Sequence, residues 1–213
     1  MAHDAPRQSG VTAMKADEAA EMMDAEKTRD RFKQRAAVAI AFFAMILAIT
    51  GLGGSNAGKE AVNNNVLASN YWNFFQAKNM RQTSFALAAD QLELRLAQND
   101  PALSPEAQAE LRKKAEAYRK TVARYESEPE TREGKKELIA RAKEYEAKRD
   151  HALKQDPYFD YAEALLQIAI VLISVAIVAD VVWLSFIGGI LGILGAMLTL
   201  NGFYLFVELP FLS

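Results

Sequence analysis

Residues 164–207 read ALLQIAIVLISVAIVADVVWLSFIGGILGILGAMLTLNGFYLFV, a run of 44 residues in which Asp180 is the single charged side chain. As one helix this run would be about 66 Å long, roughly twice the thickness of the hydrocarbon core of a bilayer. The run therefore predicts two crossings, near residues 164–179 and 186–207. An aspartate at the centre of a membrane helix costs about 2.5–3.5 kcal/mol, so the intervening turn is predicted at residues 180–185, where Asp180 reaches water.

A further membrane segment is predicted nearer the start of the chain. Residues 36–58 carry no charge, and residues 36–52 are almost wholly apolar, close to the roughly 20 residues that a spanning helix needs. A cleavable signal peptide with a small-residue site at residues 55–57 is the rival interpretation. The charge-dense leader, residues 1–35, is far longer than the basic region of a signal peptide, which favours an uncleaved anchor. The sequence therefore predicts three crossings.

The charges are segregated along the chain of 213 residues, which has a formal charge of −2 and no cysteine. Residues 1–35 carry seven basic and seven acidic side chains, and residues 59–163 carry eighteen of each. The −2 therefore belongs to Asp180 and Glu208 and gives no clue to a partner. The absence of any basic residue after Lys154 instead indicates lipid. The absence of cysteine excludes a disulfide scaffold, a thiolate metal site and a thiol nucleophile.

Orientation is predicted from five basic residues just before the first span: Lys27, Arg29, Arg31, Lys33 and Arg35. The positive-inside tendency places this leader, which we expect to be partly helical, in the cytoplasm. Three crossings then place the middle region and the C-terminal tail, residues 209–213, on the far side. The same side chains could hold anionic lipid headgroups, although a role in topology alone is the simpler interpretation.

Small residues recur with helical spacing in the first and third predicted spans. The two rows are Ala37, Ala41, Ala44, Ala48 and Gly51, and Gly188, Gly192, Gly195, Thr199 and Gly202. Each row lies on one helix face and predicts a helix-packing seam, because small residues let backbones approach closely in a membrane. Two interpretations stay open: the first span packs on the third within one chain, or the seams join copies in a homo-oligomer.

The middle region, residues 59–157, is predicted to be a helical hairpin stalk. Its proline positions predict helices near residues 59–98, 105–127 and 132–156. A first helix of about 40 residues extends roughly 60 Å, and the following residues must return that distance to the membrane. We therefore expect the second and third helices to form one returning arm with a break near Pro129.

Two neighbouring apolar stripes follow the first helix of this region. One contains Val66, Ala77, Met80, Leu87 and Leu94, and the other contains Leu67, Tyr71, Phe74, Phe85 and Leu92. Such stripes are typical of helical hairpins and coiled coils. Asn63, Asn70 and Asn73 lie on the first stripe. Asparagines at such positions can fix register and oligomeric state, or they can simply face solvent or lipid headgroups.

The sequence contains no convincing catalytic or cofactor-binding motif. Residues 53–60 read GGSNAGKE, which resembles a phosphate-binding loop but has Glu60 where the hydroxyl residue should follow the lysine. A glycine-rich hinge at the membrane boundary is the better interpretation. His3 and His151 have no neighbouring metal-ligating partner, and no basic stripe favours nucleic acid. We therefore predict no catalytic residue, cofactor, metal site or nucleic-acid partner.

Residues 68–82 read ASNYWNFFQAKNMRQ, and this motif resembles the core of a family of bacterial membrane proteins known only as a domain of unknown function. The order of leader, one span, helical region and two closing spans is also similar. The resemblance implies a small multi-pass protein of the bacterial inner (cytoplasmic) membrane and supplies no activity. The motif's candidate recognition surface is Asn70, Trp72, Gln76 and Lys78, and core packing is the alternative interpretation of these residues.

The sequence as a whole predicts an all-α membrane protein with three transmembrane helices and an extramembrane helical hairpin or coiled-coil stalk. The leading functional hypothesis is a non-enzymatic, oligomeric structural or accessory component. Its expected partners are the lipid bilayer and further copies of the chain, and an additional membrane-protein partner is left open. The alternative is an oligomeric channel or conduit for a small solute or ion, lined by the asparagines of the first middle helix.

Overall fold

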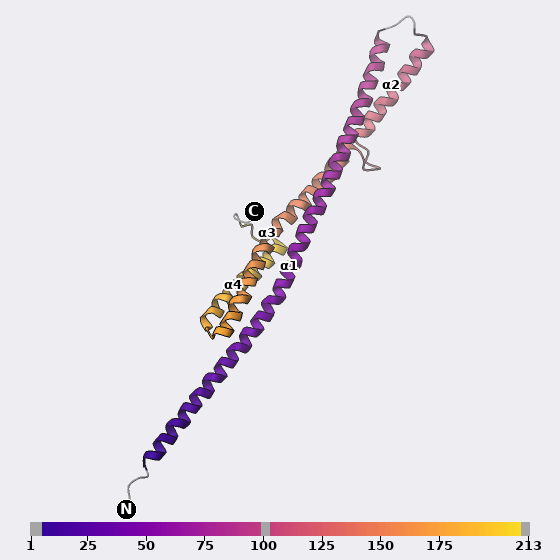
Figure 1. The fold of residues 1–213 in the computed structure, drawn as a ribbon. Coiled ribbons are helices and arrows are strands. Elements are labelled where there is room, and N and C mark those ends of the chain that lie inside the picture. Colours follow the sequence, from indigo (N-terminus) through magenta and orange to yellow (C-terminus); the bar gives the residue numbers. More distant parts are fainter. Residues whose placement is uncertain (1–5, 99–102, 210–213) are drawn as a thin grey trace, which may run out of the picture. The chain divides into compact units, whose positions relative to one another are not determined.

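The computed structural model describes residues 6–98 and 103–209, with side chains from Ala19 onward. This part of the chain is helical and contains no strand, which confirms the predicted all-α class (Figure 1). The helices are α1 Pro6–Ala97, α2 Pro105–Glu126, α3 Lys135–Ala179 and α4 Val182–Tyr204. Within it, α1, α3 and α4 are long and apolar enough to cross a membrane by length and composition.

The chain divides into two compact units. The span unit is Met1–Asn56 with Lys154–Ser213, and the hairpin unit is Ala57–Leu153. The helices α1 and α3 each contribute to both units, whereas α2 belongs to the hairpin unit and α4 to the span unit. The tail beyond Leu209 and the residues before Pro6, including His3, lie outside the described residues.

Two predicted breaks are absent from the described helices. The glycine-rich hinge at residues 53–58 was a wrong prediction, because α1 passes through these residues without interruption. The predicted gap between a third middle helix and the second span was also wrong, since α3 continues through Pro157. An internal proline removes one backbone hydrogen bond and normally costs about 3 kcal/mol or more. Tyr158 and Phe159, which follow it, are 3% and 2% exposed, so tertiary packing holds the helix here.

The turn between α3 and α4 is tighter than the predicted residues 180–185. Asp180 adopts the left-handed conformation with φ of 59°, and the N–H of Val181 donates to the carbonyl of Ala176 at 3.1 Å. This is the Schellman arrangement that ends many helices, with aspartate in the position usually taken by glycine. Because one left-handed residue reverses the chain, α4 begins at Val182 rather than near residue 186.

The core of the span unit is built on the small residues of α4. Gly188, Gly192, Gly195 and Gly202 are buried. A Cβ added to Gly188 would lie 2.7 Å from Cγ1 of Ile173 and 3.0 Å from the carbonyl oxygen of Ala169, both on α3. The glycine row of the third predicted span therefore packs against α3 within the chain. Lipid tails are as apolar as the side chains, so close van der Waals packing rather than the hydrophobic effect holds such helices together.

The remaining contacts of this row also lie inside the span unit. A Cβ on Gly195 would lie 2.8 Å from Cγ of Leu166. One on Gly192 would overlap the ring of Phe43, and one on Gly202 would lie 2.9 Å from the ring of Phe159. The rings of Phe43 in α1 and Phe159 in α3 thus occupy the space that the missing side chains of these glycines leave on α4.

The small-residue row of the first span behaves differently. Ala37, Ala41, Ala44 and Ala48 are exposed in the single chain, and a Cβ on Gly51 would meet nothing within 4 Å. The first span does pack on the third within the chain, with the ring of Phe43 at Gly192 and Thr50 at Thr199, but this contact does not use the exposed alanine row. The face of α1 that packs in the span unit carries Ala36, Phe43 and Thr50 instead, which are 6%, 6% and 0% exposed.

A buried hydroxyl pair joins α1 to α4 inside the span unit. The Oγ1 atoms of Thr50 and Thr199 are 2.8 Å apart. Each hydroxyl also lies close to a carbonyl one turn earlier in its own helix, at 2.8 Å from Ile46 and 3.0 Å from Gly195. Polar contacts of this kind join helices in membranes, where no water competes for the hydroxyl groups.

Candidate functional site

The ring-rich motif of α1 lies against α3 in the hairpin unit. Tyr71 stacks on Tyr145 with ring centroids 5.5 Å apart and ring planes at 8°. Nη1 of Arg141 donates to the hydroxyl of Tyr71 at 3.1 Å, and the indole N–H of Trp72 donates to Oε1 of Glu146 at 2.8 Å. Since Tyr71 and Trp72 are both half-buried, this part of the motif is a packing surface within the chain.

Lys78 is a buried cation on the same side of α1, 7% exposed. Its Nζ lies 3.4 Å from Oε2 of Glu128 and donates to the carbonyl oxygen of Glu133. The ammonium also lies 5.2 Å from the ring centroid of Tyr125 and 5.7 Å from that of Phe74. Burial of a cation requires such partners, because desolvation without them is costly. Lys78 therefore ties α1 to the end of α2 and to the segment before α3.

Gln82 continues this contact one turn further along α1. Its Nε2 donates to the carbonyl of Val122 at 2.9 Å and to Oε2 of Glu126 at 3.2 Å. Its Oε1 accepts a hydrogen bond from Nζ of Lys135 at 2.7 Å. The hydrogen bond from Gln82, followed by that from Lys135, holds the pKa of Glu126 below its usual value. One amide side chain thus meets both returning helices.

The segment between α2 and α3 is held by Glu137. Its carboxylate accepts hydrogen bonds from the hydroxyl of Ser127 at 2.6 Å and from the backbone N–H of Glu128 at 3.2 Å. The Ser127 hydrogen bond is the main reason that the pKa of Glu137 is lowered. Gly134 is buried, and a Cβ there would overlap the backbone nitrogen of Glu128. The break predicted near Pro129 is thus present between α2 and α3, and hydrogen bonds join it to the first turn of α3.

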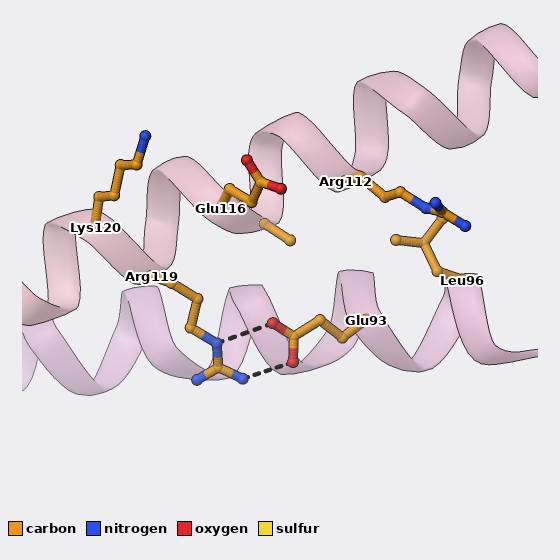
Figure 2. Close-up of a pocket in the computed structure, with 7 residues that line it drawn as sticks. Glu93, Leu96, Arg112, Glu116, Arg119 and Lys120 are labelled. Carbon is orange, nitrogen blue, oxygen red and sulfur yellow. Dashed lines mark hydrogen bonds and ion pairs between the residues drawn. The ribbon is translucent and has the colours of Figure 1, made fainter.

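A surface hollow between α1 and α2 is lined by charged side chains, among them the ion pair of Arg119 and Glu93. Figure 2 shows Arg119 of α2 reaching Glu93 of α1 through two parallel contacts, of 2.9 Å and 2.7 Å. Nη2 of Arg119 also lies 2.5 Å from Oδ1 of Asp90. The hydrogen bonds from Arg119 lower the pKa of Glu93. Because two carboxylates already neutralise this guanidinium, Arg119 serves to pack α2 on α1 rather than to bind an anionic ligand.

The opposite side of α1 in the hairpin unit is exposed among the residues that the structure describes. Ten residues with alternating three- and four-residue spacing are all exposed. We call this row the outer heptad face, and it consists of Asn63, Val66, Asn70, Asn73, Ala77, Met80, Ser84, Leu87, Gln91 and Leu94. It contains every member of the first predicted stripe. Phe85 and most of the second stripe are half-buried instead, although Phe74 is 40% exposed.

The predicted recognition surface is divided between these two sides of α1. Trp72 and Lys78 contact the returning helices, whereas Asn70 and Gln76 are exposed. Sequence reasoning also missed Asn64, which is the buried asparagine of the 63–65 cluster at 5% exposure. Asn64 lies two heptads before Lys78, so the two side chains share the packed face of α1, whereas Asn63 lies on the exposed face. Helical spacing could have shown this difference from the sequence.

Polar contacts mark both ends of the span unit. Oδ2 of Asp180, at the turn between α3 and α4, lies 2.8 Å from Nε of Arg29 in the basic leader. At the other end, Nζ of Lys154 lies 2.9 Å from Oε1 of Glu208. The hydroxyl of Tyr158 donates to the carbonyl of Val207 at 3.1 Å, which holds the segment after α4.

Among the side chains that the structure describes, in residues 19–98 and 103–209, no three His, Cys, Asp or Glu residues gather as a metal ion would require. The geometry thus defines an all-α chain with three helices able to cross a membrane and a polar helical hairpin beside them in sequence. Residues 32–205 match the family described as "Domain of unknown function (DUF4337)". The chain belongs to this family, which confirms the predicted resemblance to a domain of unknown function. No curated protein and no solved structure matches the chain significantly.

Proposed function

We propose that the chain is a non-enzymatic integral membrane protein that acts as an oligomeric structural or accessory component. In this proposal the span unit anchors the protein and the hairpin unit is an extramembrane helical stalk. The observation that carries the proposal is the division of α1 in the hairpin unit. One side of the helix is closed by rings, hydrogen bonds and ion pairs to α2 and α3, and the other side is the exposed outer heptad face.

The use of the buried polar groups supports a structural role. Lys78 binds a carboxylate, a backbone carbonyl and two rings. Thr50 meets Thr199 across two helices, and the Trp72 indole binds Glu146. Each of these groups is directed at another helix or at the segment between α2 and α3, which is how polar side chains specify packing.

The location that we propose is the bacterial inner membrane with the N-terminal leader in the cytoplasm. Lys27, Arg29 and Lys33 belong to the basic cluster that favours this orientation. The contact between Arg29 and Asp180 supports three spans, because two further spans joined by a turn at Asp180 return that turn to the side of the leader, and the basic cluster assigns this side to the cytoplasm. Labelling of a Ser127→Cys variant tests the topology. Reaction from the outside alone is expected, and reaction from the cytoplasm alone contradicts the orientation.

A conduit is the second candidate function, and one observation favours it. The side chains of Asn63, Asn70 and Asn73 all lie on the outer heptad face, so several copies could gather them around a common axis. Within one chain, the rings of Phe43 and Phe159 occupy the space beside the buried glycines of α4 in the span unit. A path would therefore have to form between copies.

Two measurements test and separate these functions. Light scattering of the detergent complex gives its protein mass, and a mass of two or more chains is expected. A monomer at all concentrations would contradict both functions. Purified protein is then placed in liposomes loaded with a potassium-sensitive dye. A scaffold passes no ion, whereas flux that falls in an Asn63→Leu, Asn70→Leu double variant would establish the conduit instead.

A further inference from the structure

The outer heptad face combines three properties that a solvent-exposed helix surface rarely has together. Its larger apolar members are well exposed: Val66 is 51% exposed, Met80 71%, Leu87 57% and Leu94 63%. Its ten positions contain no charged residue. They also keep a strict spacing of three and four residues from Asn63 to Leu94, a length of about 47 Å at 1.5 Å per residue.

We propose that the outer heptad face is the contact between two copies of this chain, with their α1 helices parallel and in the same register. This inference rests on the proposed self-association and adds to it the surface, the direction and the alignment of the contact. The hairpin unit then has an inner face that closes on α2 and α3 and an outer face that closes on the second copy.

The spacing indicates a helix of the same period as the partner. A repeat of three and four residues has a mean period of 3.5, which keeps apolar positions in contact along two supercoiled helices. A surface patch for an unrelated globular partner has no reason to keep this period over more than four heptads. A second α1 helix matches it at every turn.

Insertion into the membrane sets the direction of the two helices. The apolar segment before Leu52 and the outer heptad face belong to the same helix, α1. Copies of a membrane protein insert with one orientation, so the α1 helices of neighbouring copies run parallel. A parallel pair in register brings each residue of the outer heptad face opposite its own counterpart.

The flanking charges suit this arrangement. In a parallel coiled coil, a residue just before one core position approaches the residue five positions later on the partner. For Asp90, whose carboxylate also contacts Arg119 of its own chain, that residue is Arg95, which gives a pair of opposite charges. The corresponding pairs begin at Val62, Ser69, Gln76 and Thr83, and none of them brings like charges together. The same surface therefore contains nothing that repels its own copy.

The asparagines of the face can also be satisfied by their own copies. A carboxamide carries both a donor and an acceptor, so two identical asparagines facing each other across a two-fold axis can form a hydrogen bond. Asn63 and Asn70 occupy equivalent positions one heptad apart. Polar pairs at such positions fix the alignment of a parallel coiled coil at some cost in stability.

Cysteine cross-linking in native membranes tests the inference, because the natural chain has no cysteine. Val66→Cys, Met80→Cys and Leu94→Cys are prepared as separate single variants. Asn79→Cys is the matched control, since Asn79 is exposed on α1 but lies off the outer heptad face. Each is oxidised with copper phenanthroline, and the disulfide dimer is measured on a non-reducing gel. A disulfide requires Cβ atoms about 3.5–4.5 Å apart, so the reaction reports close approach of identical positions.

All three variants on the outer heptad face are expected to give several-fold more dimer than Asn79→Cys. An antiparallel pair would cross-link strongly at no more than one of the three positions and would overturn the proposed direction. Equal cross-linking at all four positions would overturn the proposed surface. If the wild-type mass shows an oligomer while the three variants on the outer heptad face form no disulfide dimer, the proposed function stands and this inference fails. A wild-type monomer would contradict both.

Discussion

The span unit and the hairpin unit use polar side chains in opposite places. In the span unit, ion pairs and hydrogen bonds such as Arg29–Asp180 and Lys154–Glu208 lie at the two ends, and the helices between them meet through glycines and the Thr50–Thr199 pair. In the hairpin unit, polar contacts to the returning helices recur along α1 from Trp72 through Gln82 to Glu93. This difference is what a bilayer around one unit and water around the other would produce.

The largest expected effect concerns the hairpin unit. Lys78→Met keeps the apolar stem of the side chain but leaves Glu128 without its buried partner. We expect the free energy of unfolding of this unit to fall by about 2–3 kcal/mol. The reason is that the remaining carboxylate stays partly desolvated but no longer has the ammonium that offset the cost of its burial. Urea titration in detergent checks this through Trp72 fluorescence in a Trp183→Phe background. The exposed Lys113→Met is the control, and equal midpoints for both variants would refute the role of Lys78.

The next effect concerns the span unit and distinguishes two adjacent glycines. Gly188→Ala forces a methyl group against the backbone of α3, whereas the same change at Gly189 meets nothing within 4 Å. We expect Gly188→Ala to destabilise the unit by about 1–2 kcal/mol through overpacking. Gly189→Ala should be neutral or stabilising, because alanine has the higher helix propensity. Hydrogen exchange of α4 amides measures the difference, and matched exchange rates would contradict the packed glycine row.

A smaller effect is expected at the hydroxyl pair. Thr50→Val removes the contact to Thr199, but the Thr199 hydroxyl keeps its own backbone partner at Gly195. The expected loss is therefore about 0.6 kcal/mol, the average for such contacts between membrane helices. Thermal unfolding in detergent checks this value. Ser174→Ala is the control, since the hydroxyl of Ser174 bonds to the carbonyl of Ile170 in its own helix.

Acid should weaken the hairpin unit and spare the span unit. The pKa values of Glu126 and Glu137 are lowered by hydrogen bonds in the folded chain. A lowered folded-state pKa gives stability that is present at neutral pH and is lost as the pH falls through the carboxylate range, between about pH 5 and 3. Burial raises the pKa of Asp156 in the span unit, so acidification favours its folded form. The test is the unfolding midpoint of each unit at pH 7 and at pH 4. The midpoint of the hairpin unit is expected to fall and that of the span unit to stay, and an equal fall in both would contradict this expectation.

The spans and the helical class could be predicted from the sequence because they depend on composition over long windows. The breaks could not, because their outcome depends on tertiary packing. The glycines at residues 53–54 favour a hinge locally, yet the ring of Phe159 packs against them and α1 continues. Pro157 favours a helix start locally, yet the packed residues that follow it hold α3 together.

The candidate sites show the same limit. Periodicity identified the two stripes of α1, but it could not show which stripe would meet the returning helices. The small-residue row of α1 has the same spacing as the row of α4, yet the first is exposed and the second is buried. The difference lies in the partners, since Leu166 and Ile173 of α3 face the α4 row, and spacing within one helix carries no information about its neighbours.

The central claim is that α1 uses its outer heptad face for a second copy of the chain. The most direct measurement is the mass of the protein in lipid nanodiscs, compared between the wild type, a Met80→Asp, Leu87→Asp double variant and the off-face control Asn79→Asp. Like charges facing each other across a two-fold axis repel, so the double variant is expected to be a monomer while the other two have the mass of two chains. A double variant that keeps the wild-type dimer mass would contradict the claim.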